Sequence, residues 1–257
     1  MAETGVTAIV IAKNEERVIA RCLQSLAWCN EVLLVDSGST DRTVEIARES
    51  NATVLVNTEW QGPAAQRNYG INAARGTWCL LLDADEWVTE SLRCEIRNTL
   101  ARSPLQAAFS IPRASSYCGQ IMRHGGWWPD RVTRLVRKGA ARFSGGIIHD
   151  HCVADGDVGQ LAQPLMHESY RDLDQVLGKV NAYSSWGAQD LLRAGKTPSL
   201  ARALFSGWFA FFRTYVFRAG FLDGKLGLML AISNAEHTYY KYAKAMLLVQ
   251  QRKAAAE

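Results

Sequence analysis

Carboxylates follow two of the short apolar runs in the first third of the chain. Asp36 comes directly after the run that ends at Val35, and Asp83 and Asp85 follow the run that ends at Leu82. Two carboxylates spaced by one residue can hold a hard divalent cation through oxygen and leave positions for water and phosphate. Asp36 could accept hydrogen bonds from a ribose or a base. A nucleoside diphosphate chelated to Mg²⁺ or Mn²⁺ fits both sets of carboxylates.

The segment from 6 to 112 must position these carboxylates, and its pattern is typical of alternating strands and helices. Apolar runs predict strands at 6–12, 31–35, 53–57, 77–82 and 107–112. Amphipathic stretches predict helices at 15–26, 44–49, 62–74 and 90–101, with Thr40 or Asp41 as a cap of the second. Strands that alternate with helices form a parallel sheet, and ligands bind beyond the carboxyl ends of its strands. From 113 to 170 the pattern loosens into loops with one or two strands, such as 131–136, and from about residue 173 it is helical.

The composition is that of an ordinary globular protein. The 257 residues are 48% hydrophobic and 21% charged, which excludes a disordered, collagen-like or coiled-coil chain. The first strand lacks a following GxGxxG, and the chain has no Walker A or GxSxG motif, which argues against dehydrogenase, ATPase and α/β-hydrolase chemistry. The six cysteines form no CxxC pair, so we expect reduced, partly buried thiols. The first sixteen residues lack a basic region before their apolar run, which favours a cytoplasmic protein.

Four motifs together resemble the family 2 glycosyltransferases of GT-A fold. They are VIAKNEE (10–16), VDSGSTDRT (35–43), the triplet Gln66-Arg67-Asn68 and LLLDADE (80–86). In that family a nucleotide sugar lies over the strand ends and a DxD-type motif holds the metal. The joint spacing carries the resemblance, because a DxD motif alone is common. The resemblance implies an α/β protein with a mostly parallel central sheet flanked by helices.

Later segments extend the resemblance from Thr7 to about Ala245. They look like the bacterial lipopolysaccharide inner-core glycosyltransferases that add β-glucose to the first heptose: RHGGWWPDRVTRLVRKGAARF (123–143), IIHDHCVADGDVGQL (147–161), HESYRDLDQVLGKVNAYSSWGA (167–188) and FLDGKLGLMLAISNAEHTYYKYAK (221–244). This implies inverting transfer from UDP-glucose to a lipopolysaccharide core, with Mg²⁺ or Mn²⁺ as cofactor. A catalytic domain over 1–170 would comprise a nucleotide-sugar half, about 6–112, and an acceptor half, about 113–170. Residues 171–257 would form a helical, membrane-facing extension.

The resemblance also implies roles for individual residues. Asp36 would contact the uridine moiety, although a capping or turn-making role is its alternative. Asp83 would contact the ribose or sugar, and Asp85, together with Asp83, would hold the metal. The remaining residues of the nucleotide-sugar site would be Lys13, Asn14 and Glu15 at the base and Arg67 near the phosphates or donor sugar.

An inverting transfer needs a base that takes the proton from the acceptor hydroxyl. Asp150, in the stretch IIHDH (147–151), is our candidate, because it lies in the loop-rich half that would cover the sugar. The family pattern has His-Glu where this chain has His149 and Asp150, so the acid here is shorter. His149 could orient the base, join the metal, or be an ordinary loop residue.

The stretch RHGGWWPD could line the acceptor or donor-sugar pocket. Gly125 and Gly126 permit close backbone approach, and Trp127 and Trp128 offer flat faces for sugar rings. Asp130 could bond sugar hydroxyls. The alternative is that the Trp-Trp-Pro sequence packs in the core.

Positive charge and aromatic side chains concentrate in the last fifth of the chain. The net charge of the whole chain is +4, but 199–253 holds eight basic and two acidic side chains, or +6. At about 100° per residue, a helix in this segment would gather its aromatic side chains into one arc, with Arg202 and Arg213 just beyond the edge of the arc. The members of the arc include Phe205, Trp208, Phe209 and Phe212. Its uncharged run, 203–212, is half the roughly 20 residues that span a bilayer.

We therefore expect an interfacial helix on an anionic membrane surface. The alternative is that this face docks on the catalytic domain or on a second subunit. No nucleic-acid motif accompanies the cations, so no nucleic-acid partner is expected. The resulting hypothesis is a peripheral enzyme on the cytoplasmic membrane face that moves glucose to the inner-core heptose. Its rivals are a family 2 transferase of another sugar to a polyprenyl-linked or capsule acceptor, and a non-catalytic nucleotide-binding scaffold.

Overall fold

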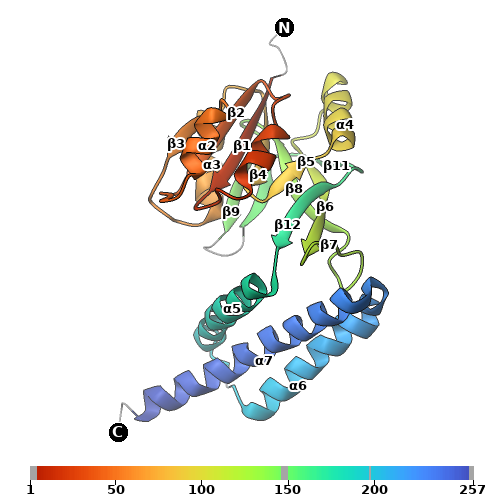
Figure 1. The fold of residues 1–257 in the computed structure, drawn as a ribbon. Coiled ribbons are helices and arrows are strands. Elements are labelled where there is room, and N and C mark those ends of the chain that lie inside the picture. Colours follow the sequence, from red (N-terminus) through yellow and green to blue (C-terminus); the bar gives the residue numbers. More distant parts are fainter. Residues whose placement is uncertain (1–4, 146–149, 197, 255–257) are drawn as a thin grey trace. The chain divides into compact units, whose positions relative to one another are not determined.

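The computed structural model describes residues 5–145, 150–196 and 198–254, which fold into two compact units. Unit 1 comprises Met1–Arg113 and Asp130–His167, and unit 2 comprises Ala114–Pro129 and Glu168–Glu257 (Figure 1). The predicted domain boundary at residue 170 stays a prediction. The compact units differ from it in grouping 114–129 with the C-terminal helices.

The first half of unit 1 is a parallel sheet, as the alternating pattern predicts. Its strands are β1 (Val6–Ala12), β2 (Glu31–Asp36), β3 (Thr53–Val56) and β4 (Trp78–Asp83), in the order β3-β2-β1-β4. The register pairs Asp36 with Ala12 and Asp83 with Ile11, so both acidic residues lie at the carboxyl end of the central strand β1. This confirms the α/β prediction and the expected placement of the carboxylates at one edge of the sheet.

After β4 the chain forms more strands than the sequence indicated. They are β5 (Glu86–Val88), β6 (Ala108–Tyr117), β7 (Gln120–Ile121), β8 (Asp130–Arg137), β9 (Ala141–Gly145), β10 (Asp150–Ala154), β11 (Val158–Gln160) and β12 (Leu165–Tyr170). β8 pairs antiparallel with both β4 and β6, while β9 and β10 form a separate antiparallel hairpin. The prediction of a mainly looped 113–170 is therefore wrong. Strands β7 and β11 have only two and three residues, and β10 is only partly buried, so these three carry no continuous apolar run.

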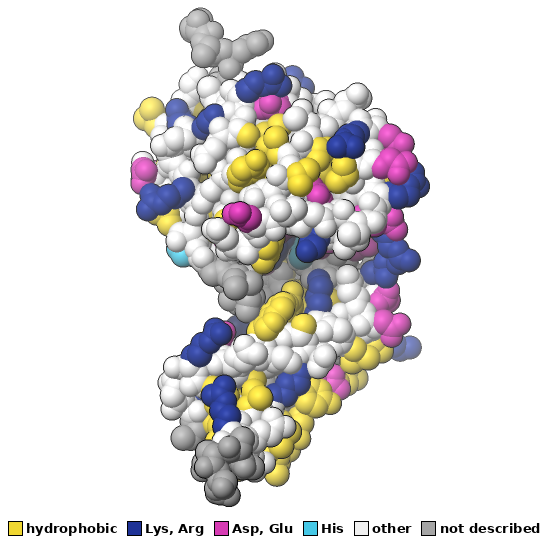
Figure 2. Space-filling view, turned by 90° about the vertical axis from the view of Figure 1, so that its left-hand side faces the viewer, with side chains coloured by type: hydrophobic (Ala, Val, Ile, Leu, Met, Phe, Trp, Pro, Cys, Tyr) yellow, Lys and Arg dark blue, Asp and Glu magenta, His cyan; other side chains and the backbone are white. Residues whose placement is uncertain are grey.

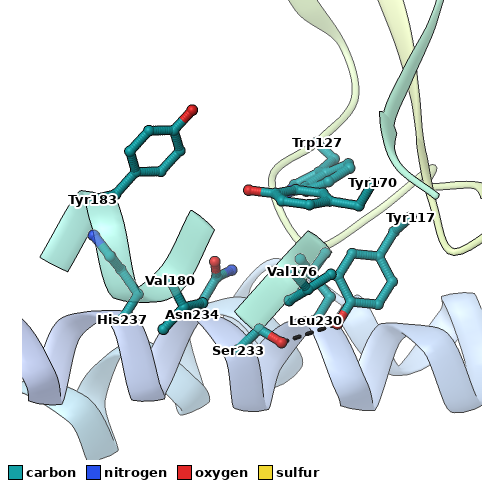
Figure 3. A pocket seen from close by; sticks show the side chains of 10 residues that line it. All are labelled: Tyr117, Trp127, Tyr170, Val176, Val180, Tyr183, Leu230, Ser233, Asn234 and His237. Atoms are coloured by element: carbon teal, nitrogen blue, oxygen red, sulfur yellow. Dashed lines mark hydrogen bonds between the residues drawn. The ribbon is translucent and has the colours of Figure 1, made fainter. Parts of the chain in front are cut away.

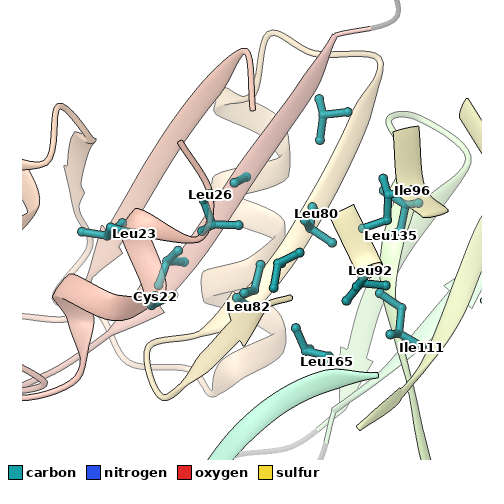
Figure 4. Packing of buried hydrophobic residues seen from close by; sticks show 14 of the residues in the cluster. Cys22, Leu23, Leu26, Leu80, Leu82, Leu92, Ile96, Ile111, Leu135 and Leu165 are labelled. Carbon is teal, nitrogen blue, oxygen red and sulfur yellow. The ribbon is translucent and has the colours of Figure 1, made fainter. Parts of the chain in front are cut away.

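The helices of unit 1 are α1 (Ile19–Gln24), α2 (Thr43–Glu49), α3 (Pro63–Ala73) and α4 (Glu90–Ala101). Helix α1 is shorter than the predicted 15–26. Its expected first turn is instead tied to the start of α2, because Glu15 N donates to Oγ1 of Thr43, the first residue of α2, and Glu16 N donates to Asp41 Oδ2 just before that helix. Figure 4 shows the core that these elements share, with Leu23 of α1 and Leu26 just after it near the sheet, together with Leu92 and Ile96 of α4.

Unit 2 is mainly helical, with α5 (Leu173–Arg193), α6 (Leu200–Phe212) and α7 (Gly224–Ala254). A π-helical segment, Arg213–Phe217, follows α6. Helix α6 buries small residues, Ala203, Gly207 and Ala210. A Cβ on Gly207 would lie 3.2 Å from a carbonyl oxygen and a side-chain carbon of α7, so the two helices approach closely there. No helix among the described residues is both long enough and hydrophobic enough to cross a bilayer.

The large side chains of α6 consequently face away from α7. Leu204, Phe205, Trp208 and Phe209 are exposed, with Phe205 at 66% and Trp208 at 58%. Figure 2 shows hydrophobic side chains gathered along one edge of the helical unit. The aromatic arc expected from the sequence is therefore present, and it is not used to pack α6 within unit 2.

Candidate active site at the carboxyl edge of the sheet

Helix α3 carries three consecutive polar residues that join different parts of unit 1. Gln66 Nε2 donates to the carbonyl of Asn57 at 2.8 Å and so ties α3 to the end of β3. Asn68 Nδ2 donates to the carbonyl of Phe143, and Phe143 N donates back to Asn68 Oδ1, both at 2.8 Å. This reciprocal pair fixes the β9–β10 hairpin against α3. The hairpin in turn positions Asp150, the first residue of β10.

Arg67, between these two, bridges two of the predicted site carboxylates. Its Nε donates to Asp150 Oδ2 at 2.7 Å, and its Nη2 donates to Asp83 Oδ1 at 2.7 Å. Arg67 is only 2% exposed, so both ion pairs are shielded from water on the arginine side. Arg67 thus brings together Asp150, the predicted base, and Asp83, the residue predicted to contact the ribose or sugar. These two residues are 67 positions apart in the sequence.

Arg134, Glu86 and Arg113 complete this network, and the sequence analysis assigned no role to them. Arg134 Nη2 donates to Asp83 Oδ2 at 2.6 Å and to Glu86 Oε1 at 2.9 Å. Glu86 is fully buried and accepts from Asp83 N and from Arg113 Nη1, while Arg113 also pairs with Asp130 at 2.6 Å. One signal was available: Arg134 lies inside the predicted strand 131–136, where a charged residue facing a core requires a carboxylate partner.

The arginines determine the charge of Asp83. Burial on its own would raise the pKa of this carboxyl group, but the nearby Arg134 and Arg67 guanidinium groups outweigh burial and hold the pKa well below its usual range. Asp83 is therefore a carboxylate at neutral pH. Because Arg67 and Arg134 each use a carboxylate oxygen, its position is fixed from two sides.

Two cationic N–H groups in this network have no protein partner among the described residues. They are Nη1 of Arg67 and Nε of Arg134, and both are buried. Buried donors are nearly always satisfied in folded proteins, and charged donors cost most when they are not. These two donors are therefore left unsatisfied within the described part of the chain, beside Asp83 at the carboxyl edge of the sheet.

Asp85 lies beside His167, a residue that the sequence analysis quoted within a motif but did not place in the site. The distance from His167 Nε2 to Asp85 Oδ2 is 3.4 Å, and the pairing of β12 with β5 sets His167 opposite Glu86. Carboxylate and imidazole are both ligands of divalent cations, so the pair suits such a cation. The described ranges hold no cluster of three or more His, Cys, Asp or Glu side chains arranged for a metal. Mg²⁺ commonly needs only one or two carboxylates, because substrate phosphates and water fill its other positions.

The loops after β1 and β2 contain the predicted base-pocket residues. Asp36 is 2% exposed and accepts from Gly38 N at 3.0 Å and from Ser39 Oγ at 2.5 Å, which supports its turn-making alternative. Asn14 Oδ1 accepts from Thr40 N at 2.8 Å, so the two loops are joined. Lys13 is exposed and Glu15 partly buried in the same loop. Contact of these residues with uridine stays a prediction.

Neither Thr40 nor Asp41, the two predicted caps of α2, occupies its N-cap position, although Asp41 still accepts from a backbone N–H of the first turn. Arg42 occupies the N-cap position, and no side chain caps it. Asp41 Oδ1 instead accepts from Thr43 N at 3.0 Å and from Thr43 Oγ1 at 2.6 Å. Asp41 thus satisfies a backbone donor of the first turn from outside the cap position.

The RHGGWWPD segment divides between the two units. Asp130 belongs to unit 1, where it pairs with Arg113, whereas Gly125, Gly126, Trp127 and Trp128 belong to unit 2. The two glycines have positive φ angles of 67° and 87°. Trp127 packs against other aromatic rings of unit 2, and the Trp128 ring lies 5.4 Å from the guanidinium of Arg123. Their predicted contact with sugar stays a prediction, and His149 lies outside the described residues.

Comparison with known sequences identifies the family. The sequence profile of Glycosyl transferase family 2 matches residues 7–155, a range that contains all of the acidic motifs described above. The chain belongs to glycosyltransferase family 2. This confirms the resemblance seen in the motifs, and the transferase activity of the family is thereby the activity class of this chain.

Relatives extend the similarity beyond the matched range. The chain is 28% identical over 256 residues to the lipopolysaccharide core biosynthesis glycosyltransferase LpsC of Rhizobium meliloti, covering 92% of this chain and 93% of that protein. It is 30% identical over 257 residues to an uncharacterized glycosyltransferase of Rickettsia bellii, covering 93% and 85%. Among solved structures, the mannosyltransferase PcManGT of Pyrobaculum calidifontis, in complex with GDP-Man and Mn²⁺, is similar in fold, with a TM-score of 0.50, 16% identity and coverage of 98% and 80%. The GT-A fold predicted from the motifs is confirmed.

Proposed function

We propose that this chain transfers glucose, with inversion, from UDP-glucose to the inner-core heptose of lipopolysaccharide at the cytoplasmic face of the membrane. Family membership shows glycosyl transfer. The similarity to LpsC over nearly the whole of both chains supports a lipopolysaccharide-core acceptor. The observation that carries the proposal is the bridge from Arg67 to both Asp83 and Asp150, with buried cationic donors left for a ligand beside it.

The site residues divide the work of an inverting transfer. The unpartnered N–H groups of Arg67 and Arg134 donate to the diphosphate or to a sugar hydroxyl of the donor. Asp83, fixed between the same two arginines, orients the ribose or sugar. Asp150 Oδ2 accepts from Arg67, which orients this carboxylate and leaves Oδ1 to take the proton of the acceptor hydroxyl.

A divalent cation fits the Asp85 and His167 pair. Asp85 and His167 would hold Mg²⁺ or Mn²⁺, with Asp83 as the second predicted carboxylate ligand, although both oxygens of Asp83 already accept from arginines. When bound, the cation supplies charge stabilisation for the leaving diphosphate.

Helix α6 would lay the protein on the membrane. Its exposed Phe205, Trp208 and Phe209 present an apolar face, and exposed Arg202 and Arg213 stand at its ends. Aromatic rings at the acyl boundary and arginines at anionic headgroups suit an interfacial helix. The +6 charge of 199–253 supports an anionic lipid surface as the partner.

The test combines product identification with variants of the metal pair. The purified protein is incubated with UDP-glucose, Mg²⁺ or Mn²⁺ and truncated lipopolysaccharide, and mass spectrometry is used to detect one added hexose. We expect Asp85→Ala to lower the transfer rate by at least about 100-fold, whereas Asp157→Ala, an exposed carboxylate away from this network, keeps it. A chelator should abolish transfer, and added Mn²⁺ should restore it.

Other outcomes would redirect the proposal. Full activity of Asp85→Ala would remove Asp85 from the metal site. Transfer of a different sugar would change the proposed donor, and transfer to a polyprenyl phosphate would change the proposed acceptor. Either result would leave the proposed glycosyl transfer reaction in place. Tight UDP binding without turnover on any lipid-linked acceptor would favour the non-catalytic scaffold.

A further inference from the structure

Unit 2 contains a cavity of about 220 Å³ that the proposed chemistry does not use (Figure 3). Four aromatic side chains line it, and they come from different segments of unit 2: Tyr117 from β6, Trp127 from the loop before β8, Tyr170 from the end of β12, and Tyr183 from α5. Helix α7 contributes the floor (Figure 3). A lining so rich in aromatic rings favours a ligand with flat apolar faces.

One end of the cavity is a packed aromatic cluster. The ring centroids of Tyr117 and Trp127 are 6.0 Å apart, and those of Trp127 and Tyr170 are 5.8 Å apart. The hydroxyl of Tyr117 is paired with Ser233 Oγ at 2.9 Å, so Tyr117 is locked in place from α7. Each ring holds its neighbours in position, which makes this end of the cavity preformed.

The other end carries polar groups that remain able to bind a ligand. Asn234 donates from Nδ2 to Thr214 Oγ1 at 3.2 Å, and its amide oxygen is available to accept. Burial lowers the pKa of His237, and the Lys241 and Lys244 ammonium groups lower it further, against a bond to the Tyr183 backbone. His237 is therefore neutral at neutral pH and can exchange hydrogen bonds with an uncharged ligand.

These features match a pyranose ring better than a hydrocarbon chain. A pyranose has apolar C–H faces that stack on aromatic rings and a rim of hydroxyls that bond to side chains such as Asn234 and His237. A hydrocarbon would displace water from these polar groups without forming hydrogen bonds to them, which costs free energy. Drug-sized ligands occupy roughly 300–1,000 Å³, so this smaller cavity has room for a single ring.

We propose that this cavity binds one pyranose ring of the acceptor glycan, an inference that rests on the proposed transferase function for its biological meaning. Three continuous chain segments carry residues of both the candidate active site and the cavity, separated by only three or four positions. The pairs are Arg113 with Tyr117, Trp127 with Asp130, and His167 with Tyr170. This continuity favours an acceptor sugar over a ligand unrelated to transfer.

Val180 allows the cavity to be filled without disturbing the acidic network. It lines the cavity from α5, and a phenylalanine there would occupy the space of the ring. Leu177, three residues earlier on the same helix, is 48% exposed and is not part of the lining, so Leu177→Phe is a matched control. Thermal unfolding of both variants checks that each remains folded.

The experiment measures saccharide binding and transfer separately on the full chain. Saturation-transfer NMR uses methyl β-glucopyranoside and methyl α-mannopyranoside as saccharide probes and octanoate as a hydrocarbon probe. We expect a saccharide signal in the wild type and in Leu177→Phe that is lost in Val180→Phe. In the transfer assay, Val180→Phe should raise the acceptor KM by about tenfold or more while UDP-glucose hydrolysis without acceptor stays unchanged.

The outcomes separate this inference from the proposed function. An octanoate signal in place of a saccharide signal, an unchanged acceptor KM in Val180→Phe, or no signal from any probe would overturn the saccharide assignment. In each of those cases transfer by the wild type would still stand. Conversely, saccharide binding that Val180→Phe abolishes, in a protein that transfers no sugar, would support the cavity and refute the proposed function.

Discussion

At the scale of single residues, the candidate site is organised by ion pairs rather than by isolated carboxylates. Asp83 contacts two arginines, and Asp150 contacts one of the same two. A buried charge pair costs more to break than it contributes when intact, because removing one member leaves the other unpaired in a poor solvent for charge. Substitutions here must therefore preserve shape while changing only the chemistry under test.

Asp150→Asn fulfils that requirement for the candidate base. An amide keeps an oxygen that can accept from Arg67 Nε but cannot take a proton from the acceptor. We expect the transfer rate to fall by about 10²–10⁴-fold with little change in UDP affinity, measured by steady-state kinetics and calorimetry. Asp155→Asn, an exposed neighbour, serves as the control. Undiminished transfer by Asp150→Asn would show that the base lies elsewhere.

Asp83 should make the protein sensitive to acid. The pKa of Asp83 is lower in the folded protein than in the unfolded chain. As the pH falls below about 4, the unfolded chain therefore binds a proton at Asp83 before the folded protein does. The stabilising contribution of this group is therefore complete above that pH and decreases as the pH falls. We expect the difference in free energy of unfolding between wild type and Asp83→Asn to stay constant at neutral pH and to narrow as the pH falls below about 4 in denaturant titrations. A difference that is independent of pH would contradict this.

The motifs nominated Asp83, Asp85, Arg67 and Asp150 as site residues, but they did not indicate the side chains that contact them. Motif spacing reports residues that lie close in the sequence. The contact of Arg134 with Asp83 spans 51 residues and crosses from β8 to the end of β4. Such pairings depend on strand order in the antiparallel half, which the pattern of residues did not predict.

At the scale of elements, the accuracy of the sequence-based prediction followed burial. Strands β1, β2 and β4 are buried along most of their length, so their apolar runs predicted the bounds to within one residue. Strand β10 is mostly half-exposed and β11 has only three residues, so neither gave a usable signal. The helix α4 was predicted at its observed bounds because its buried Leu92, Ile96 and Leu100 recur with helical spacing.

The link between α3 and the β9–β10 hairpin can be tested through Asn68. Asn68→Ala removes both bonds to the backbone of Phe143 and leaves these groups unsatisfied. We expect the free energy of unfolding to fall by about 1–3 kcal/mol and transfer to fall as well, because the hairpin holds Asp150. Asn72→Ala, at an exposed position on the same helix, should change neither. Normal activity in a destabilised Asn68→Ala would mean that the hairpin is positioned by other contacts.

At the scale of the whole molecule, the distribution of charge and of exposed aromatic side chains differs along the chain. The acidic network belongs to unit 1, while the exposed aromatic residues of α6 and the excess of positive charge belong to unit 2. The sequence predicted the aromatic arc but left open whether it packs inside the protein. The small residues Ala203, Gly207 and Ala210, which form the buried side of α6, explain why the arc is exposed.

Membrane binding should depend on that arc and on salt. We expect Phe205→Ser combined with Trp208→Ser to weaken binding to vesicles that contain anionic lipid by about tenfold or more, measured by co-sedimentation. Raising the salt concentration should weaken binding of the wild type, and neutral vesicles should bind less. Leu247→Ser, an exposed change on α7, is the control. Unchanged vesicle binding would contradict a membrane role for the arc, and loss of self-association in the double variant would indicate a second copy of the chain as the partner.

The triplet at positions 66–68 limits how this protein can evolve. Consecutive residues on a helix point about 100° apart, which is why one turn of α3 reaches β3, the acidic site and the hairpin at once. A single inserted or deleted residue upstream within α3 would rotate all three side chains away from their partners together. Loop lengths elsewhere in unit 1 can drift, but we expect the length of α3 before Gln66 to be held constant among functional descendants of this chain.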